Sequence, residues 1–516
     1  MSVSLKVVAR NASSNVTRFA LAGLVRFFLT PFIVFHLGAE GYGLWALALA
    51  AIGLLSLLEF GFGTAVVWAT ARFDPNDPQR RLRRLSTLAA LHLGLTFLTL
   101  PLLAGLIFYF PSWFDVPPQH LGAGRLILLF LGLRFALIAI PFGFFKNVLF
   151  GLQHISAINL VQIVIVLLYA LTVWLVLSQG GTIVHLAIIH LVMGFLEYMA
   201  YAGLYFRLAS PIKLSWRSID LRLTRELLSF SASSFIIGIS GFILLKTDPI
   251  LVQLGLSLSA VALYAIALKV VENLHLLLKQ VVNVLSPVVA DLDSDGHTDA
   301  LRFIFTHVAR HALWVGSLPA AALFVLGHPF LTLWIAPDFG DAAPTLSVLL
   351  FAMTLVIPQL VASNIMTMVG RHQFIATASL FGALLNVGAS LLFLFIFDLG
   401  LLGIALGTLT AVLFVDCGLI LWRTCRHLQL RYLHYLRTVF LPAFFCGLMQ
   451  WIVTAFLASL FSPTHLLHLS LLALPGVLLS AALYLRFYAL ADLRRWRASR
   501  FSDPRNPSDS RSASYV

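Results

Sequence analysis

The segment AINLVQIVIVLLYALTVWLVLS, residues 157–178, contains no Asp, Glu, Lys or Arg. A run of about 20 apolar residues, wound as an α-helix, spans the roughly 30 Å hydrocarbon core of a bilayer. Inside lipid the backbone must satisfy its own hydrogen bonds, so such a run is helical. The segment therefore predicts one transmembrane helix.

Similar runs recur along the whole chain. Of its 516 residues, 60% are hydrophobic and only 11% are charged, and no soluble domain of this size is so apolar. We expect an all-α polytopic membrane protein with about fourteen transmembrane helices. The predicted spans are residues 16–37, 43–70, 86–110, 124–145, 157–178, 182–206, 227–251, 259–288, 311–334, 344–369, 375–397, 401–422, 438–461 and 467–490.

Lys and Arg are distributed unevenly over the connections between these spans. If the N-terminus is cytoplasmic, alternate connections should be rich in Lys and Arg and the others poor. The outside connections contain none: 38–42, 111–123, 179–181, 252–258, 335–343, 398–400 and 462–466. The inside connections and the tail contain Arg72, Arg80, Arg81, Arg83, Arg84, Arg207, Lys213, Arg217, Arg222, Arg225, Arg423, Arg426, Arg431, Arg437, Arg494, Arg495, Arg497 and Arg500. Both termini are therefore predicted to be cytoplasmic.

This topology also accounts for the net charge of +13. Basic connections on the cytoplasmic side contact anionic lipid head groups. No RNA- or DNA-binding pattern accompanies the arginines. We therefore predict membrane lipids, and no nucleic acid, as partners.

An internal repeat divides the chain. The residue numbers of Gly151, which opens GLQH, and Gly370, which opens GRHQ, differ by 219, as do those of Gly181 and Gly400. The numbers of Gly38 and Gly255 differ by 217. Each repeat holds six predicted helices, and an even number returns the chain to its starting side. Two lobes of like orientation, related by a pseudo-twofold axis along the membrane normal, are therefore expected, with a midplane cavity suited to alternating access.

The repeat predicts the domain organisation. Residues 1–219 form the N-terminal six-helix lobe and residues 220–437 the C-terminal six-helix lobe. Residues 438–490 add two helices, and residues 491–516 form a disordered cytoplasmic tail rich in Ser, Pro and Arg.

Eight basic residues fall within or at the edges of spans and need an explanation. A charge at the centre of a transmembrane helix costs about 2.5–3.5 kcal/mol on insertion scales, so it usually faces a partner or an aqueous cavity. Arg125 and Arg486 sit near span ends, where their side chains can snorkel to the interface. The other six are candidates for binding an anionic ligand: Arg18, Arg26, Arg134, Lys246, Lys269 and Lys279.

The eighth predicted span carries the strongest polar signal. At about 100° per residue, Lys269, Glu272 and Lys279 fall on one narrow face with His275 beside it. This stripe either lines a cavity or contains a Lys269–Glu272 pair that only fastens helices. Three acids are candidates for ion pairing or for carrying a coupling proton: Glu59, Asp248 and Glu272.

The sequence carries no catalytic signature. No HExxH motif or paired carboxylate accompanies the histidines, and there is no P-loop. We therefore predict neither catalytic residues nor a metal or cofactor site, and the protein is not expected to be an enzyme.

Two pairs of motifs resemble a known family. LGAEGYGLW, residues 37–45, followed by EFGFG, residues 59–63, is similar to the opening of polysaccharide transporters related to O-antigen flippases. KTDPIL, residues 246–251, with LYAIALK, residues 263–269, resembles the second-half counterpart. Glu59 stands where the family usually has an aspartate. These proteins belong to the multidrug/oligosaccharidyl-lipid/polysaccharide flippase superfamily.

The resemblance implies a function. The substrate would be an undecaprenyl-pyrophosphate-linked oligosaccharide, either an O-antigen unit of lipopolysaccharide or an exopolysaccharide repeat unit, flipped across the bacterial inner membrane. A glycan polymerase and other assembly proteins are implied as partners. Two alternatives remain open: a cation-coupled multidrug antiporter of the same fold, whose cavity should be acidic, and a membrane-embedded glycan polymerase or ligase.

Overall fold

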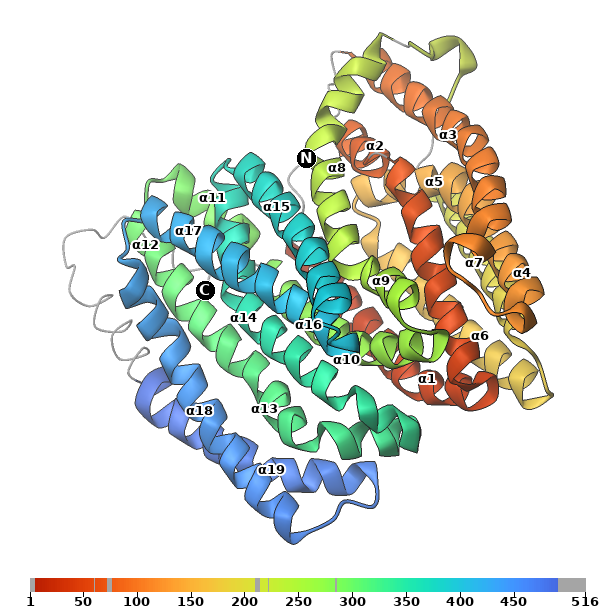
Figure 1. Ribbon diagram of the computed structural model, residues 1–516. Helices are drawn as coiled ribbons and strands as arrows, with labels where there is room; N and C mark the ends of the chain where they lie inside the picture. Colours follow the sequence, from red (N-terminus) through yellow and green to blue (C-terminus); the bar gives the residue numbers. More distant parts are fainter. Residues whose placement is uncertain are drawn as a thin grey trace. The chain divides into compact units, whose positions relative to one another are not determined.

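The computed structural model describes residues 5–59, 61–71, 77–208, 214–220, 222–283 and 285–490. Within these ranges the chain is helical, with no strand (Figure 1). It divides into two compact units, residues 1–265 (unit 1) and 266–516 (unit 2), which are described separately. The predicted disordered tail, residues 491–516, and the predicted cytoplasmic residues Arg72 and Lys213 lie outside the described residues.

Unit 1 is built from the helices of the first half of the chain. They are α1 (Leu5–Ser56), η1 (Leu57–Glu59), α2 (Phe62–Ala71), α3 (Pro78–Trp113), η2 (Pro118–His120), α4 (Leu121–Leu133), η3 (Arg134–Ala139), α5 (Ile140–Gly151), α6 (Ile155–Ser178), α7 (Ile183–Leu208), η4 (Trp216–Ser218), α8 (Leu223–Lys246) and α9 (Asp248–Gly255). Helix α10 (Leu258–Asn283) continues into unit 2.

Unit 2 contains the remaining helices. They are α11 (Ser286–Ser294), α12 (Thr298–Phe303), η5 (Ile304–Val308), α13 (Ala309–Trp334), η6 (Pro337–Ala342), α14 (Ala343–Met368), α15 (His372–Leu391), η7 (Leu392–Ile396), α16 (Gly400–Ala411), η8 (Val412–Leu421), α17 (Trp422–His427), α18 (Tyr432–Leu460), α19 (Leu466–Tyr484) and η9 (Leu485–Ala489).

The described residues contain twelve helices long and apolar enough to cross a membrane. The first, Ser13–Glu59, has 47 residues, about 70 Å of helix at 1.5 Å per residue and twice the length that one crossing needs. It is interrupted at Gly38, where φ is 70° and ψ is 173°, a left-handed backbone that favours glycine. This stretch therefore accommodates the first predicted span and part of the second. The 24-residue helix α8 is not among the twelve, and the count of fourteen stays a prediction.

The transmembrane helices expose apolar side chains, whereas the surface helices of a soluble protein expose polar ones. On α6 only Ile158, Asn159, Val173 and Leu177 are buried, while Leu160 and Trp174 are 62% and 53% exposed. Exposed apolar side chains along a whole helix are stable in lipid and not in water. The chain is therefore a multi-pass membrane protein.

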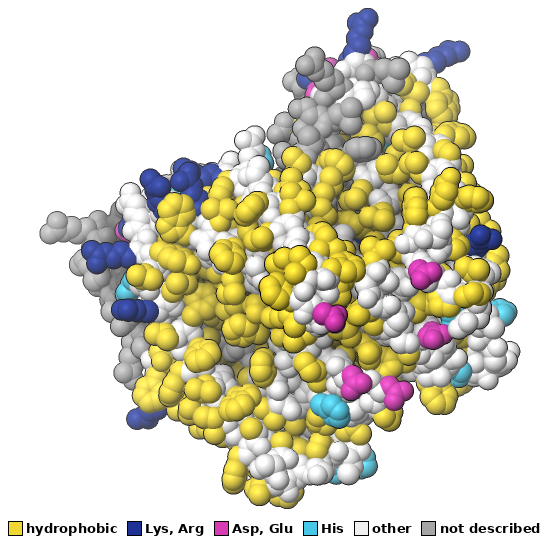
Figure 2. Space-filling model, viewed as in Figure 1, with side chains coloured by type: hydrophobic (Ala, Val, Ile, Leu, Met, Phe, Trp, Pro, Cys, Tyr) yellow, Lys and Arg dark blue, Asp and Glu magenta, His cyan; other side chains and the backbone are white. Residues whose placement is uncertain are grey.

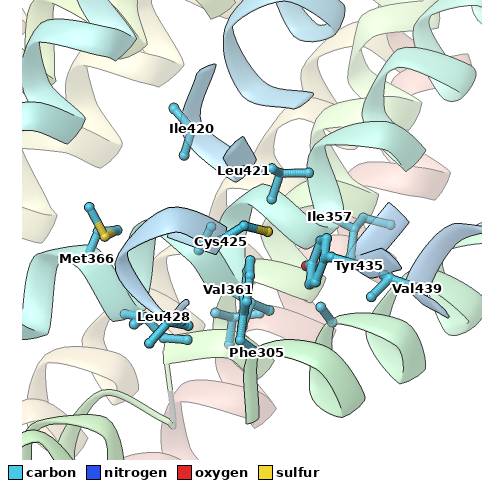
Figure 3. Close-up of a cluster of buried hydrophobic side chains, with 14 of the residues drawn as sticks. Phe305, Ile357, Val361, Met366, Ile420, Leu421, Cys425, Leu428, Tyr435 and Val439 are labelled. Carbon is cyan, nitrogen blue, oxygen red and sulfur yellow. The ribbon is translucent and has the colours of Figure 1, made fainter. Parts of the chain in front are cut away.

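The core of unit 2 joins α13, α14, η8, α17 and α18. Phe305 stacks on Tyr435 with ring centroids 4.3 Å apart and planes 12° from parallel. Cys425 and Leu428, each 1% exposed, pack into the same cluster (Figure 3). This packing fixes the end of α17.

Lys and Arg side chains gather at one end of unit 2. Figure 2 shows Lys and Arg side chains beside α12 and α17; the exposed acids Asp291, Asp293, Asp295 and Asp299 belong to the same end. An excess of Lys and Arg on one side of the spans is what the positive-inside rule describes; which side is cytoplasmic stays a prediction.

Helix starts in the two halves follow the predicted repeat. Pro118 opens η2 and Pro337 opens η6, and their residue numbers differ by 219. Helices α7 and α16 begin at Ile183 and Gly400, whose residue numbers differ by 217. The compact units nevertheless divide after residue 265, because α8 and α9 pack on α1 and α2. The predicted lobe boundary at residues 219 and 220 stays a prediction about the repeat.

Candidate functional site

The transmembrane helices of unit 1 hold a network of charged and hydroxyl side chains centred on Arg134. Arg134 opens η3, a π-helical turn between α4 and α5. Such turns are rare and are often found at functional sites. Its Nη2 lies 3.8 Å from Glu197 Oε2 on α7, and the two side chains are 25% and 16% exposed. The pair is therefore loose and only partly shielded.

Helix α7 positions both the acid and the space beside it. The Tyr201 hydroxyl, one turn after Glu197, donates to Glu197 Oε1 at 2.8 Å. Gly194, one turn before Glu197, lies against the guanidinium: a Cβ atom there would sit 2.3 Å from Arg134 Nε. The missing side chain at residue 194 thus makes room for Arg134.

Lys146 extends the network along α5. Its Nζ lies 5.8 Å from the centroid of the Tyr201 ring, within cation–π distance. Lys146 also interacts electrostatically with Glu59 at the end of η1. The network therefore links α5 and α7 to the acid of the EFGFG motif.

Glu59 lines a pocket of about 230 Å³ within unit 1. Its other lining residues come from both sides of the passage from α1 to α2 and from α8: Ser56, Leu57, Gly61, Gly63, Thr64, Phe235, Gly238, Ile239 and Phe242. Gly63 is closely packed here, since a Cβ atom would lie 2.8 Å from Asn147 Nδ2. A ligand atom in this pocket would face the Glu59 carboxylate.

The network carries more positive than negative charge. Arg18 interacts electrostatically with Arg26 and with Tyr201; Arg18 is half-buried and Arg26 is exposed. With Arg134 and Lys146 these make four cations among the described residues of the network, against the two acids Glu59 and Glu197. An uncompensated cation inside a bilayer is costly and usually faces water or an anionic partner. The surplus favours an anionic ligand.

The other predicted site residues lie elsewhere. Lys246 is exposed at the end of α8. Asp248 is 1% exposed and its Oδ2 accepts from the Tyr264 hydroxyl at 2.6 Å, which ties α9 to α10. This bond gives Asp248 a structural role, and its role in coupling stays a prediction.

Three residues of the predicted polar stripe lie on the part of α10 that belongs to unit 2. Lys269 and Glu272 are half-buried and Lys279 is exposed. The neighbouring His275 Nδ1 lies 2.9 Å from Met353 Sδ on α14. That these residues line a cavity stays a prediction.

Sequence reasoning missed Lys146, because it ended the fourth span at residue 145. The structure continues α5 to Gly151, and the span Pro118–Gly151 includes Lys146. The signal was available: the residues from Val148 to Gly151 remain apolar.

A second polar cluster was also missed, in unit 2 between α13 and α19. Arg310, assigned to a connection, is only 5% exposed. Its neighbour His311 lies with Nδ1 2.6 Å from the Tyr484 hydroxyl. Trp314 stacks on Tyr484 with ring centroids 4.3 Å apart and its Nε1 donates to Ser480 Oγ at 3.2 Å. The cluster fastens one of the two additional helices to the unit.

Comparison with known proteins gives one family model and one curated relative that each match more than half of this chain. A family model described as "Polysaccharide biosynthesis protein" matches residues 8–293. The "Uncharacterized membrane protein EpsK" of Bacillus subtilis (strain 168) is 27% identical over 350 residues, 65% of this chain and 67% of EpsK.

Two solved structures are similar in fold. "Lipid II flippase MurJ, inward closed conformation" superposes with a TM-score of 0.69 at 14% identity, over 93% of this chain and 98% of that one. The "Inward-facing conformation of a multidrug resistance MATE family transporter of the MOP superfamily" gives 0.67 at 16% identity, over 80% and 94%. The fold is therefore the one used by flippases and multidrug transporters.

Proposed function

Because this chain belongs to the polysaccharide biosynthesis protein family, we propose that it flips an undecaprenyl-pyrophosphate-linked oligosaccharide across the bacterial inner membrane. The substrate would be an O-antigen or exopolysaccharide repeat unit, moved from the cytoplasmic to the periplasmic leaflet by alternating access. Family and fold are of the transporter type, not of catalytic enzymes. Both termini would be cytoplasmic, and a glycan polymerase would use the flipped product.

The observation that carries the proposal is the surplus of cations in the Arg134 network. A pyrophosphate is a multiply charged anion, and arginine binds phosphate oxygens through paired, charge-assisted hydrogen bonds. Arg134 is separated from Glu197 by 3.8 Å, a distance beyond a direct hydrogen bond. Its guanidinium therefore retains donors for a phosphate, with Lys146 adding a second charge.

The same surplus separates the proposal from the antiporter alternative. A cavity that collects cationic drugs should carry net negative charge, because like charges repel inside a medium of low dielectric. The described network of unit 1 has four cations and two acids, which suits the opposite class of substrate.

Reconstituted transport is the direct test. Full-length protein in liposomes is supplied with a fluorescent lipid-linked oligosaccharide, and the fraction that becomes accessible at the far leaflet is followed. Arg134→Ala and Lys146→Ala should each abolish flipping while the protein inserts normally. The matched control is Arg125→Ala, which removes an exposed arginine near the end of a span.

Cells give a second readout. Arg26→Ala and Lys269→Ala should each abolish surface glycan while the protein accumulates, and normal glycan in both would refute those two assignments. A deletion strain with normal glycan and hypersensitivity to cationic dyes would establish the antiporter instead.

A further inference from the structure

Unit 2 contains a small pocket lined only by residues with polar or charged side chains. Its volume is about 230 Å³. One residue of the lining belongs to the turn between α14 and α15, and the others come from α17 and the turn that follows it. The lining residues are Arg371, Arg423, Arg426, His427 and Gln429. The pocket lies at the helix ends where Figure 2 shows Lys and Arg gathered.

The wall that follows α17 is fixed from two sides. Arg302 Nε donates to the carbonyl oxygen of Leu428 at 2.7 Å, and its Nη2 donates to Gln429 Oε1 at 2.8 Å. Arg302 is itself held by Asp299 at 2.7 Å. Cys425 and Leu428, which flank the lining residues in the chain, are buried in the core of unit 2 (Figure 3).

The opposite wall is held by its own turn. Gly370 has a φ of +80°, which glycine adopts without strain. The N–H of Arg371 then donates to the carbonyl oxygen of Met366 at 2.8 Å. Both walls of the pocket are therefore anchored by backbone or side-chain hydrogen bonds.

The charges of the pocket are not balanced by acids. In the described part of the chain, none of Arg371, Arg423 and Arg426 forms an ion pair with a carboxylate. Asp293 interacts electrostatically with His427, but no acid is among the described residues that line the pocket. Three guanidinium groups around one hollow repel one another, and an anion between them removes that repulsion.

We propose that this pocket binds a phosphate group. The planar guanidinium of arginine, with five N–H donors, matches the geometry of phosphate oxygens better than a lysine ammonium does. The pocket lies at the predicted cytoplasmic surface, where anionic lipids attract basic segments, and basic pockets between transmembrane helices bind phosphate-bearing lipid heads. The phosphate comes either from such a lipid or from solution. The site is separate from the Arg134 network, so the proposal does not depend on the proposed transport function.

The test compares two triple variants of the full-length protein in detergent micelles. One is Arg371→Gln/Arg423→Gln/Arg426→Gln. The charge-matched control is Arg125→Gln/Arg437→Gln/Arg486→Gln, three exposed arginines outside the pocket. Binding is measured as the shift in unfolding temperature on titration with phosphatidylglycerol, with phosphatidylcholine, or with inorganic phosphate at constant ionic strength.

We expect the pocket variant to bind its ligand at least ~10-fold more weakly than the wild type, and the control to stay within ~2-fold, since the loss of a single charge-assisted hydrogen bond lowers affinity by about tenfold or more. A response to phosphatidylglycerol alone identifies a lipid head group as the source. A response to inorganic phosphate as well identifies free phosphate. Equal losses in both triple variants, or no preference of the wild type for phosphatidylglycerol or phosphate over phosphatidylcholine or chloride, would overturn the proposal.

A triple variant with conservative substitutions tests the proposal if the first pocket variant does not fold. Arg371→Lys/Arg423→Lys/Arg426→Lys preserves the charge and removes the paired donors of the guanidinium. We expect an intermediate, several-fold loss of affinity. Wild-type affinity in this variant would show that general positive charge, and no built phosphate site, is responsible.

Discussion

At the predicted repeat offset of 219, Arg134 and Glu197 of unit 1 align in sequence with Met353 and Asp416 of unit 2. In unit 1 these positions hold a partly buried ion pair with a hydroxyl partner. In unit 2, Met353 packs against an apolar cluster that includes Val412. At these aligned positions both predicted repeats carry an acid, but only the first carries a cation. If an anionic group of the substrate binds at these positions, only the first repeat offers it a cation.

The comparison is tested most strongly by replacing Arg134 and Met353 with alanine, one at a time. Arg134→Ala removes the central cation, and we expect at least ~100-fold slower flipping because several charge-assisted hydrogen bonds to the phosphate are lost. Met353→Ala should leave flipping within a few-fold of the wild type. Both are measured in the liposome assay. Equal losses for the two variants would show that the repeats contribute alike.

A smaller effect is expected from crowding Arg134 without removing it. Gly194→Ala places a Cβ atom 2.3 Å from Arg134 Nε, so the guanidinium must shift. We expect flipping to fall by about tenfold, since displacement by about 1 Å at a binding group is costly. Gly203→Ala on the same helix is the control, because nothing lies within 4 Å of its added Cβ atom. A loss of activity in both variants would point to helix α7 as a whole.

Substitution of one tyrosine in each unit compares the polar network of unit 1 with the α13–α19 cluster of unit 2. Tyr201→Phe removes the hydrogen bond to Glu197, and Tyr484→Phe removes the contact with His311. Each should lower the free energy of unfolding by about 1 kcal/mol, measured by thermal or denaturant unfolding in detergent. Only Tyr201→Phe should also slow flipping, by a few-fold. Slower flipping in Tyr484→Phe would give the additional helices a part in transport.

The sequence predicted most transmembrane helices because lipid leaves the backbone no alternative to helical hydrogen bonding. Helix α6 begins at Ile155 and ends at Ser178, against a predicted span of 157–178. The first two predicted spans are separated by residues 38–42, and the backbone break occurs at Gly38. Hydropathy is sufficient for such features, because it depends on local composition.

The partners of the charged residues were not predictable in the same way. Periodicity places Lys269 and Glu272 on one face, but it does not say which neighbouring helix meets that face. Asp248 was a coupling candidate, yet its partner Tyr264 is 16 residues away on the next helix. Lys146 was missed because a helix boundary was placed too early. Tertiary packing decides these roles, and a single sequence contains no direct record of it.

The smallest expected effect comes from the apolar counterpart itself. Met353→Leu conserves volume in the cluster with Val356 and Val412, and swaps of this kind usually cost less than about 1.5 kcal/mol. The contact of His275 with the sulfur is lost, a soft interaction of modest strength. We therefore expect a slightly lower unfolding temperature and flipping within ~2-fold of the wild type, because a tenfold change in rate needs about 1.4 kcal/mol of barrier height. Severe loss of flipping with unchanged stability would mean that the sulfur or His275 takes part in transport, and the contrast between the repeats would then be one of ligand type and not of charge.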